Sequence, residues 1–194
     1  LKLIISDANI EFIIIDNDTK GLFDTTAQTH QLISIDAVNL EKKLPTFVKN
    51  SDTFCILYTS GSTGAPKGVV LPEKGISRVV EKPNFIKVLP GDKIAQTANQ
   101  TFDAAQMECW LAWNHGASLV LFNKETILNI DLFQDKLKAE KNTHIWLTAG
   151  LFDLLANIRP EIFENLKFLM VGGDVVHKET ITKEILHPKY RSEQ

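Results

Sequence analysis

The chain has 194 residues, of which 44% are hydrophobic, and a formal net charge of −3 at pH 7. This length can bury a core and corresponds to one or two domains, while the weak charge gives no electrostatic basis for binding nucleic acid or an anionic membrane. No apolar run approaches the roughly 20 residues that a membrane-spanning helix needs, and no signal peptide is visible. The two cysteines, Cys55 and Cys109, lie in apolar surroundings and are expected to be reduced thiols of a cytoplasmic protein.

The N-terminal part of the chain contains two short apolar runs separated by polar, turn-rich sequence. We expect the end of a helix, a turn at residues 6–9 and then a strand at residues 11–15. A second strand is expected at residues 32–35, before a polar connection that contains Pro45. A strand as apolar as the first is typical of a parallel sheet that is covered on both faces.

From residue 54 onward, apolar runs alternate with amphipathic segments. Strands are expected at residues 54–58, 69–71, 92–99, 117–122, 143–147 and 166–171. Helices are expected at residues 73–81, 102–113, 130–141 and 151–158, and at the start of the tail after residue 178. Gly116 is expected to end the second helix, and Leu132, Phe133 and Leu137 to lie on the buried side of the third. The alternation predicts an α/β fold with a largely parallel sheet flanked by helices.

A loop rich in glycine and hydroxyl residues joins the first two of these later strands. It runs from Thr59 to Gly68 and carries one lysine, Lys67. Backbone N–H groups, hydroxyls and a positive charge together suit a phosphate group. A Walker-type loop is excluded, because Pro66 stands where that motif needs glycine and Gly68 stands where it needs a hydroxyl. The loop is therefore either a phosphate-binding loop of another kind or a flexible linker.

Residues Tyr58 to Gly68 match the pattern Y-T-S-G-[ST]-T-G-x-P-K-G over its whole length. In this the chain resembles the adenylate-forming superfamily, which includes acyl- and aryl-CoA ligases, luciferases and the adenylation domains of nonribosomal peptide synthetases. The resemblance implies that ATP and Mg²⁺ bind here, with Thr59 nearest the metal and with Lys67 and Thr59 in catalytic roles. The implied phosphate-binding residues are Thr59, Ser60, Gly61, Ser62, Thr63, Gly64 and Lys67.

Asp103 is the most informative charge, because it precedes an otherwise apolar helix face. Its spacing alone leaves two interpretations open: a helix N-cap made by Asp103 or Thr101, or a ligand site. The segment resembles the F-D-x-S motif of amino-acid-activating domains, although Ala105 replaces the serine. The resemblance implies that Asp103 pairs with a substrate α-ammonium and that the side-chain pocket is uncharged, favouring an apolar or small side chain. The implied substrate-binding residues are Phe102, Asp103, Ala104, Met107, Gly150, Met170 and Gly172.

The segment Gly172-Gly173-Asp174 follows the last predicted strand. It resembles the loop that passes along the adenine in this superfamily, and the alternative is a plain strand-to-helix turn. Ligands bind beyond the carboxyl ends of strands in open parallel sheets. We therefore expect this loop, the Phe102–Asp103 segment and the phosphate loop to meet at one crevice.

The remaining candidate side chains carry no clear chemistry. The five histidines lack metal-ligand spacing, Glu108 is expected to face solvent, and Trp110, Trp113 and Trp146 are expected in the core. No base is needed for adenylation, because an ionised substrate carboxylate can attack the α-phosphorus of ATP directly.

The resemblance extends over nearly all of residues 1–194 and implies a fragment of a large adenylation domain. Residues 1–50 would form its N-terminal α/β portion, and residues 51–194 the phosphate-loop and pocket portion. A Y-G-P-T-E-like segment, a ribose-binding aspartate and the C-terminal subdomain with its catalytic lysine are not found, so the fragment is expected to catalyse little alone. The implied reaction forms aminoacyl-AMP for a phosphopantetheine thiol on a peptidyl carrier domain. The alternatives are an acyl- or aryl-CoA ligase and a non-catalytic nucleotide-binding module.

Overall fold

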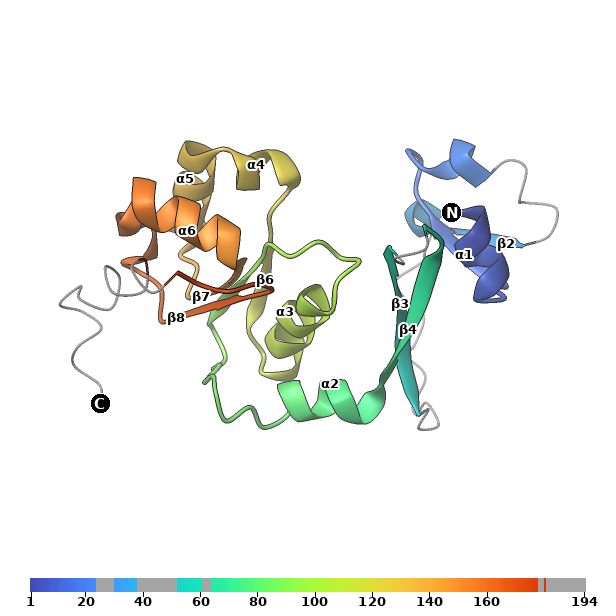
Figure 1. The fold of residues 1–194 in the computed structure, drawn as a ribbon, viewed down its shortest axis with the longest axis horizontal. Coiled ribbons are helices and arrows are strands. Elements are labelled where there is room, and N and C mark those ends of the chain that lie inside the picture. Colours follow the sequence, from blue (N-terminus) through green and yellow to red (C-terminus); the bar gives the residue numbers. More distant parts are fainter. Residues whose placement is uncertain (24–29, 38–51, 61–63, 178–179, 181–194) are drawn as a thin grey trace. The chain divides into compact units, whose positions relative to one another are not determined.

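The computed structural model describes residues 1–23, 30–37, 52–60, 64–177 and 180 (Figure 1). The chain divides into two compact units, Leu1–Leu71 and Pro72–Gln194, and each is described by itself. The subdivision predicted between residues 50 and 51 falls outside the described residues, as does nearly all of the tail for which a helical start was expected.

The N-terminal unit begins with a small parallel sheet. Its elements are α1 (Lys2–Asp7), β1 (Phe12–Ile15), the 3-10 turn η1 (Lys20–Phe23), β2 (Gln31–Ser34) and η2 (Ile35–Ala37). Strands β1 and β2 pair in parallel, as predicted, and Ile5, Ile15 and Phe23 form a small core. The prediction that both faces of β1 are covered is wrong for the described residues. Phe12 and Ile14 remain 53% and 72% exposed, because alternate side chains of a strand point to opposite faces.

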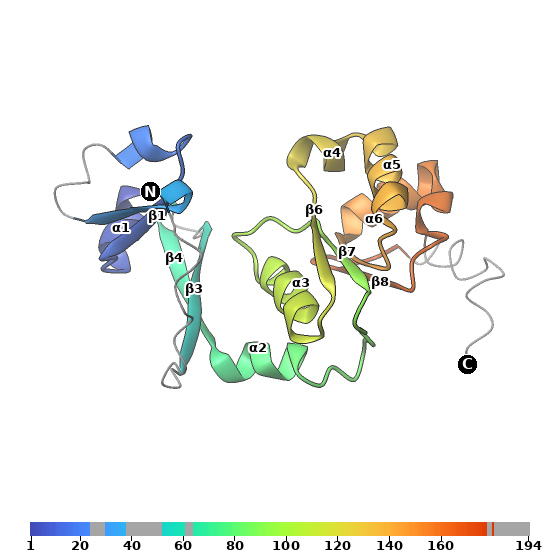
Figure 2. The same cartoon turned by 180° about the vertical axis from the view of Figure 1, so that it is seen from behind.

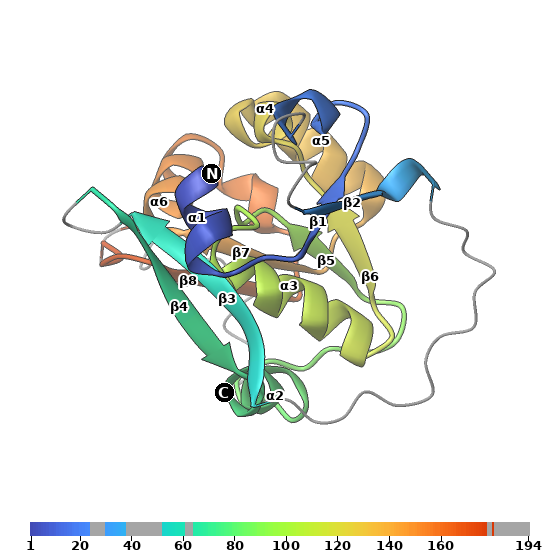
Figure 3. The ribbon, with the colours of Figure 1, turned by 90° about the vertical axis from the view of Figure 1, so that its right-hand side faces the viewer.

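The same unit contains a β-hairpin. Strands β3 (Thr53–Ser60) and β4 (Pro66–Pro72) form a separate two-stranded sheet, and Figure 3 shows them running in opposite directions. Both strands were expected, and the structure extends them toward each other. Between the two strands in the sequence, Gly61, Ser62 and Thr63 lie outside the described residues.

The second unit is built on a four-stranded sheet. Its strands are β5 (Lys93–Gln96), β6 (Ser118–Leu121), β7 (His144–Thr148) and β8 (Phe168–Gly172), in the order β6-β5-β7-β8. Every pairing is parallel, so the predicted α/β class with a parallel sheet is confirmed. The chain moves from β5 to one side to form β6 and then returns to the other side to form β7. A topological switch point therefore lies between β5 and β7.

Helices cover both faces of this sheet (Figures 1 and 2). On one face, α2 (Glu73–Val80) and α3 (Asp103–Asn114) pack over a cluster that includes Ile94 and Leu111. The other face carries α4 (Lys124–Leu128), α5 (Ile130–Glu140), α6 (Ala149–Ile158) and the turn η3 (Pro160–Phe163). Their core includes Phe133, Leu137 and Leu155, as the helical spacing predicts for the first two. Leu132 is 45% exposed, so its predicted place on the buried face is wrong.

Helix α3 ends where Gly116 was expected to stop it. Gly116 has φ +67, a left-handed conformation that costs glycine little. The Ala117 N–H donates to the carbonyl of Ala112 at 2.8 Å, and the Gly116 N–H donates to that of Trp113 at 3.4 Å. This pair of bonds is the Schellman arrangement, and it directs the chain straight into β6.

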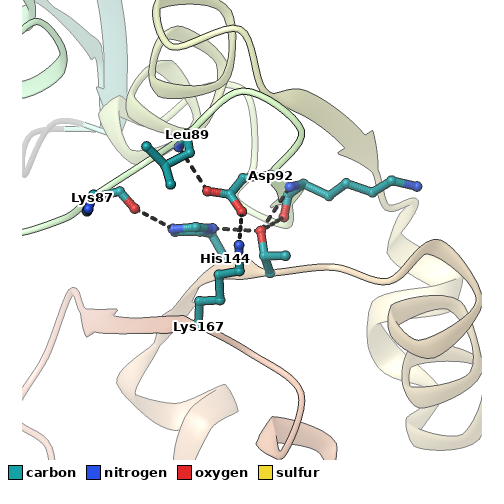
Figure 4. A network of polar contacts seen from close by, with 7 residues as sticks. Lys87, Leu89, Asp92, His144 and Lys167 are labelled. Carbon is teal, nitrogen blue, oxygen red and sulfur yellow. Dashed lines mark hydrogen bonds and ion pairs between the residues drawn. The ribbon is translucent and has the colours of Figure 1, made fainter. Parts of the chain in front are cut away.

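A buried carboxylate holds together the amino ends of β5 and β8 (Figure 4). Asp92 is 2% exposed and accepts hydrogen bonds from the Leu89 N–H at 2.9 Å and from Lys167 Nζ at 2.6 Å. Burial by itself would raise the pKa of Asp92. The bonds from Lys167 and Leu89 outweigh burial, so the pKa lies below its ordinary value.

The side chains of Thr143 and His144 extend this contact to β7. His144 Nε2 lies 3.0 Å from the carbonyl of Lys87, so Nε2 carries a proton and donates it. The Thr143 hydroxyl lies 2.7 Å from His144 Nδ1 and accepts a bond from the Lys93 N–H at 2.9 Å. The amino end of the sheet is thus closed by polar contacts.

Candidate adenylate-forming site

The predicted phosphate-binding residues that the structure describes lie on the hairpin. Thr59 and Ser60 end β3, Gly64 lies in the connection, and Lys67 is the second residue of β4. All four are exposed. Within the described part of the chain, the exposed Lys67 side chain has no hydrogen bond or ion pair.

Two further residues of the motif shape this hairpin. The Tyr58 hydroxyl donates to Asp7 Oδ2 at 2.6 Å, which raises the pKa of Tyr58 and ties β3 to the end of α1. A Cβ at Gly68 would lie 3.1 Å from Ile56 and 3.2 Å from the Tyr58 ring. Gly68 therefore lets β4 approach the Tyr58 side chain closely. Sequence reasoning gave neither residue a role, although both belong to the matched motif.

The argument that led us to expect one crevice holds for two of the three loops, and the crevice itself stays a prediction. The Phe102–Asp103 segment follows β5 and Gly172–Asp174 follows β8, so both lie at the carboxyl end of the parallel sheet. The phosphate loop does not belong to this sheet, because β3 pairs with β4 in a sheet of their own. The argument from carboxyl ends therefore covers two of the three loops.

Asp103 is the first residue of α3 and does not cap it. The N-cap residue is Phe102, and no side chain makes a capping bond there. Thr101 instead donates its hydroxyl to Asn99 Oδ1 at 2.9 Å. In the described residues, the exposed carboxylate of Asp103 has no hydrogen-bonding partner, so the capping interpretation is wrong.

A small, mostly apolar pocket lies between α3 and the sheet. It brings together two predicted substrate-binding residues, Met107 of α3 and Met170 of β8. Its lining consists of Ile86, Ile94, Met107, Glu108, Leu111, His144, Ile145, Trp146, Phe168 and Met170. Gly172 lies next to it, since a Cβ there would be 3.5 Å from the indole nitrogen of Trp146.

The other predicted substrate-binding residues lie outside this lining. Ala104 is on the first turn of α3, one turn before Met107, and Phe102 is exposed at the start of the helix. Gly150 is exposed in the first turn of α6, with open space where a side chain would stand. Their roles stay predictions.

Glu108 is buried, and the prediction that it faces solvent is wrong. It is 1% exposed, and the N–H groups of Thr97 and Ala98 both donate to Oε1 at 3.2 Å. Burial raises the pKa of Glu108 to about 7, against the effect of these bonds. The sequence did contain a signal, because Glu108 precedes Leu111 and Ala112 by three and four positions and so shares their buried helix face.

The tryptophans differ from one another. Trp113 is 58% exposed, so its predicted place in the core is wrong. Trp110 packs edge-on against it at a ring distance of 5.3 Å, and Trp110 and Trp146 are both partly buried.

The loop after β8 turns sharply. Gly173 has φ +85, and Asp174 Oδ1 accepts a hydrogen bond from the Val175 N–H at 2.7 Å. Both residues are exposed. These features fit both the turn and the base-binding interpretation, so the adenine contact stays a prediction.

Two searches of the described residues gave negative results. They contain no group of three or more histidine, cysteine or acidic side chains that could hold a metal ion. They also contain no helix long and apolar enough to cross a membrane.

Comparisons with known proteins identify the family. Residues 1–187 match the family model described as AMP-binding enzyme, so the chain belongs to that family. It is 38% identical over 147 residues to bacitracin synthase 1 of Bacillus licheniformis, covering 76% of this chain and 3% of that protein. It is 33% identical over 191 residues to surfactin synthase subunit 2 of Bacillus subtilis (strain 168), covering 94% and 5%. The chain therefore spans only a small part of the curated relatives that it matches.

Solved structures show the same fold. The N-terminal subdomain of NpsA from Klebsiella oxytoca is similar with a TM-score of 0.76 at 23% identity, over 96% of this chain and 48% of that one. PA1221, an NRPS protein containing adenylation and PCP domains, has a TM-score of 0.72 at 24% identity, over 84% and 29%. The resemblance to adenylation domains of nonribosomal peptide synthetases is confirmed.

Proposed function

We propose that this chain is the central part of a domain that activates an amino acid as aminoacyl-AMP, with ATP as the second substrate. The whole domain would then load the aminoacyl group onto a phosphopantetheine thiol. The partners would be a peptidyl carrier domain and a C-terminal adenylation subdomain. A cytoplasmic location belongs to the same proposal and is supported by the two free thiols, Cys55 and Cys109.

The observation that carries the proposal is the exposure and position of the Asp103 side chain. Its carboxylate is exposed, takes no part in capping α3, and stands one helical turn before Met107 of the apolar pocket. An α-amino acid has an ammonium group beside its side chain. Such a substrate would pair its ammonium with Asp103 and direct its side chain toward Met107 and Met170.

The hairpin would bind the phosphates of ATP. The Lys67 ammonium and the hydroxyls of Thr59 and Ser60 are exposed, and they suit the charge and acceptor oxygens of a triphosphate. The residues Gly61, Ser62 and Thr63 and the loop Gly172-Gly173-Asp174 would bind the rest of the nucleotide. Orientation of the substrate carboxylate in line with the α-phosphorus is then the main contribution of the protein.

The hydroxyl groups of the hairpin suit a magnesium ion that binds mainly through the phosphates of ATP. Mg²⁺ commonly keeps several waters and binds through substrate phosphates with one or two protein oxygens. The hydroxyl of Thr59 would be such an oxygen, and the ion would neutralise phosphate charge when bound. The lack of an acidic cluster among the described residues agrees with a metal carried mainly by ATP.

Pyrophosphate exchange on the full-length protein tests the proposal. Exchange should depend on one or a few amino acids in a panel of amino acids, aryl acids and fatty acids. Asp103→Ala should raise the KM for the amino acid by about 10- to 100-fold, the value of a hydrogen bond to a charged group, and leave the KM for ATP nearly unchanged.

The matched control is Glu125→Ala, which removes an exposed acidic side chain from the first turn of α4. Its KM values should equal those of the wild type. An Asp103→Ala variant with an unchanged amino-acid KM would refute the ammonium role.

The second candidate is an aryl-acid or acyl-CoA ligase. It is favoured by neighbours that were solved as the NpsA N-terminal subdomain in complex with 3-hydroxybenzoyl-AMSN and as the N-terminal domain of FACL13. Exchange that depends on an aryl or fatty acid, with no response to amino acids, would favour this candidate. A complete absence of exchange would favour a non-catalytic nucleotide-binding module.

A further inference from the structure

At the switch point between β5 and β7, a side chain continues the link between the two strands. The strands pair through their main chains at Ile94 and His144. Further along, the Thr97 hydroxyl reaches across and donates to the carbonyl of Trp146 at 2.6 Å. Ligands of open parallel sheets bind at the carboxyl side of such a point. Thr97 therefore fixes the spacing of the two strands where a ligand would bind.

Glu108 joins this contact from helix α3. Besides the two N–H groups that it binds, its Oε1 lies 3.2 Å from the Thr97 hydroxyl oxygen. That hydroxyl lies between two acceptors, Oε1 of Glu108 and the carbonyl of Trp146, and its proton links α3 through Thr97 to β7.

These hydrogen bonds tie the Glu108 side chain of α3 to the segment of backbone that leads into the same helix. Glu108 holds the first residues of the β5–α3 connection, Thr97 and Ala98. The connection is then folded by its own bonds, since the Phe102 N–H donates to the carbonyl of Asn99 at 2.9 Å. Asp103 is the next residue and begins α3, the helix that also carries Glu108. The position of the Asp103 carboxylate thus depends on the contacts that Glu108 makes five residues further along α3.

We propose that Glu108 and Thr97 are positioning residues for Asp103, and that together they hold the β5–α3 connection at the switch point in the geometry that receives the substrate. The inference rests on the proposed function, because it assigns a role to Asp103 in substrate binding. Neither residue needs to touch the substrate. Their effect reaches it through residues 99–103.

The test uses Thr97→Val in the full-length protein, because valine keeps the shape and loses the hydroxyl. The KM for the activated acid should rise about five-fold, the size of one lost hydrogen bond, while the KM for ATP stays within error. Thr97→Ser, which keeps the hydroxyl, should restore the wild-type KM. Backbone amides of residues 99–105 should exchange hydrogen for deuterium faster in Thr97→Val than in the wild type.

Thr143→Val is the matched control. Thr143 also bridges to β5, through the Lys93 carbonyl at 3.1 Å, but at the amino end of the sheet. This variant should lose comparable stability without changing either KM or the exchange of residues 99–105. Equal changes in both variants would mean that Thr97 is merely structural and would overturn the inference. If Thr97→Val does not fold, Glu108→Met removes the acceptor instead and is judged by the same two measurements.

Failure of the proposed function gives a different result. If the wild-type protein activates an aryl or fatty acid, the amino-acid proposal fails, and the KM for that acid still tests the positioning role. The amide exchange measurement needs no activity. Unchanged exchange of residues 99–105 in Thr97→Val would overturn the inference whichever acid is used.

Discussion

Two opposing physical effects act on the pKa of Glu108, a buried carboxyl group. Removing a carboxylate from water disfavours its charged form, whereas N–H donors favour it. Here burial dominates over the bonds from Thr97 and Ala98, and the pKa rises from 4.5 to about 7. The folded protein therefore holds the proton more tightly than the unfolded chain does. Folding stability gained from this group is complete below about pH 4.5 and is lost as the pH rises toward 7.

Glu108→Gln should remove this pH dependence. Glutamine keeps an acceptor oxygen and a donor in nearly the same shape, but it cannot ionise. The free energy of unfolding of the wild type, relative to this variant, should fall by about 3 kcal/mol between pH 4.5 and pH 8, since each pKa unit corresponds to about 1.4 kcal/mol. Urea unfolding at a series of pH values measures it.

Glu125→Gln provides the control, because Glu125 is exposed in the first turn of α4. Its stability relative to the wild type should show almost no slope over the same range. A flat difference for Glu108→Gln would mean that Glu108 ionises in the folded protein as it does in water.

The hairpin β3–β4 is the element whose geometry the matched motif controls most directly. The Tyr58 side chain is held between its bond to Asp7 and the close approach of Gly68. The exposed Thr59, Ser60 and Lys67 lie next to these two residues in the sequence. Packing on the hairpin therefore governs the positions of the groups that we propose bind phosphate.

Gly68→Ala should disturb this presentation. The new methyl group would meet the side chains of Ile56 and Tyr58 at 3.1 and 3.2 Å, so these side chains must shift by a few tenths of an ångström. We expect a loss of stability of about 1–3 kcal/mol, typical of overpacking, and a KM for ATP that rises more than the KM for the activated acid. Steady-state exchange kinetics measures both constants.

Gly21→Ala is the comparison, since a Cβ at Gly21 meets nothing within 4 Å. It should leave the stability and both KM values nearly unchanged. An equal rise of both KM values in Gly68→Ala would argue against a specific effect on the ATP side.

At the scale of the whole molecule, the similarity to the NpsA N-terminal subdomain covers 96% of this chain and 48% of that subdomain. The adenylate-forming superfamily that it resembles also uses a Y-G-P-T-E-like segment, a ribose-binding aspartate and a C-terminal lysine. These groups would complete the site that the proposed reaction needs.

The 194 residues expressed alone should therefore catalyse little pyrophosphate exchange. Bound nucleotide should be detectable only at high concentration, because the hairpin groups supply only part of the contacts that the resemblance implies. Isothermal titration with ATP measures nucleotide binding, and an assay of pyrophosphate exchange measures catalysis. Both are compared with the full-length protein. Robust exchange by the isolated chain would contradict this prediction.

The sequence by itself determined the features that depend on local patterns. The strand and helix order follows from the alternation of apolar runs and amphipathic segments. The stop of α3 at Gly116 follows from backbone sterics. The family follows from the residues Tyr58 to Gly68, which match its motif over their whole length. Each of these features depends on residues close together in the sequence, so it can be predicted without knowledge of the fold.

Only the tertiary structure decided the features that depend on distant neighbours. Whether Asp103 caps its helix, and which backbone groups Glu108 binds, are set by the helix register and by the neighbouring strand β5. Whether Trp113 lies in the core depends on which helix face the sheet covers, and Trp113 lies outside it. Which sheet contains β3, the strand before the phosphate loop, depends on the strand that it pairs with, and the sequence of β3 alone does not specify that partner. Contacts between residues far apart in sequence leave no periodic pattern, so they could not be predicted from composition or spacing.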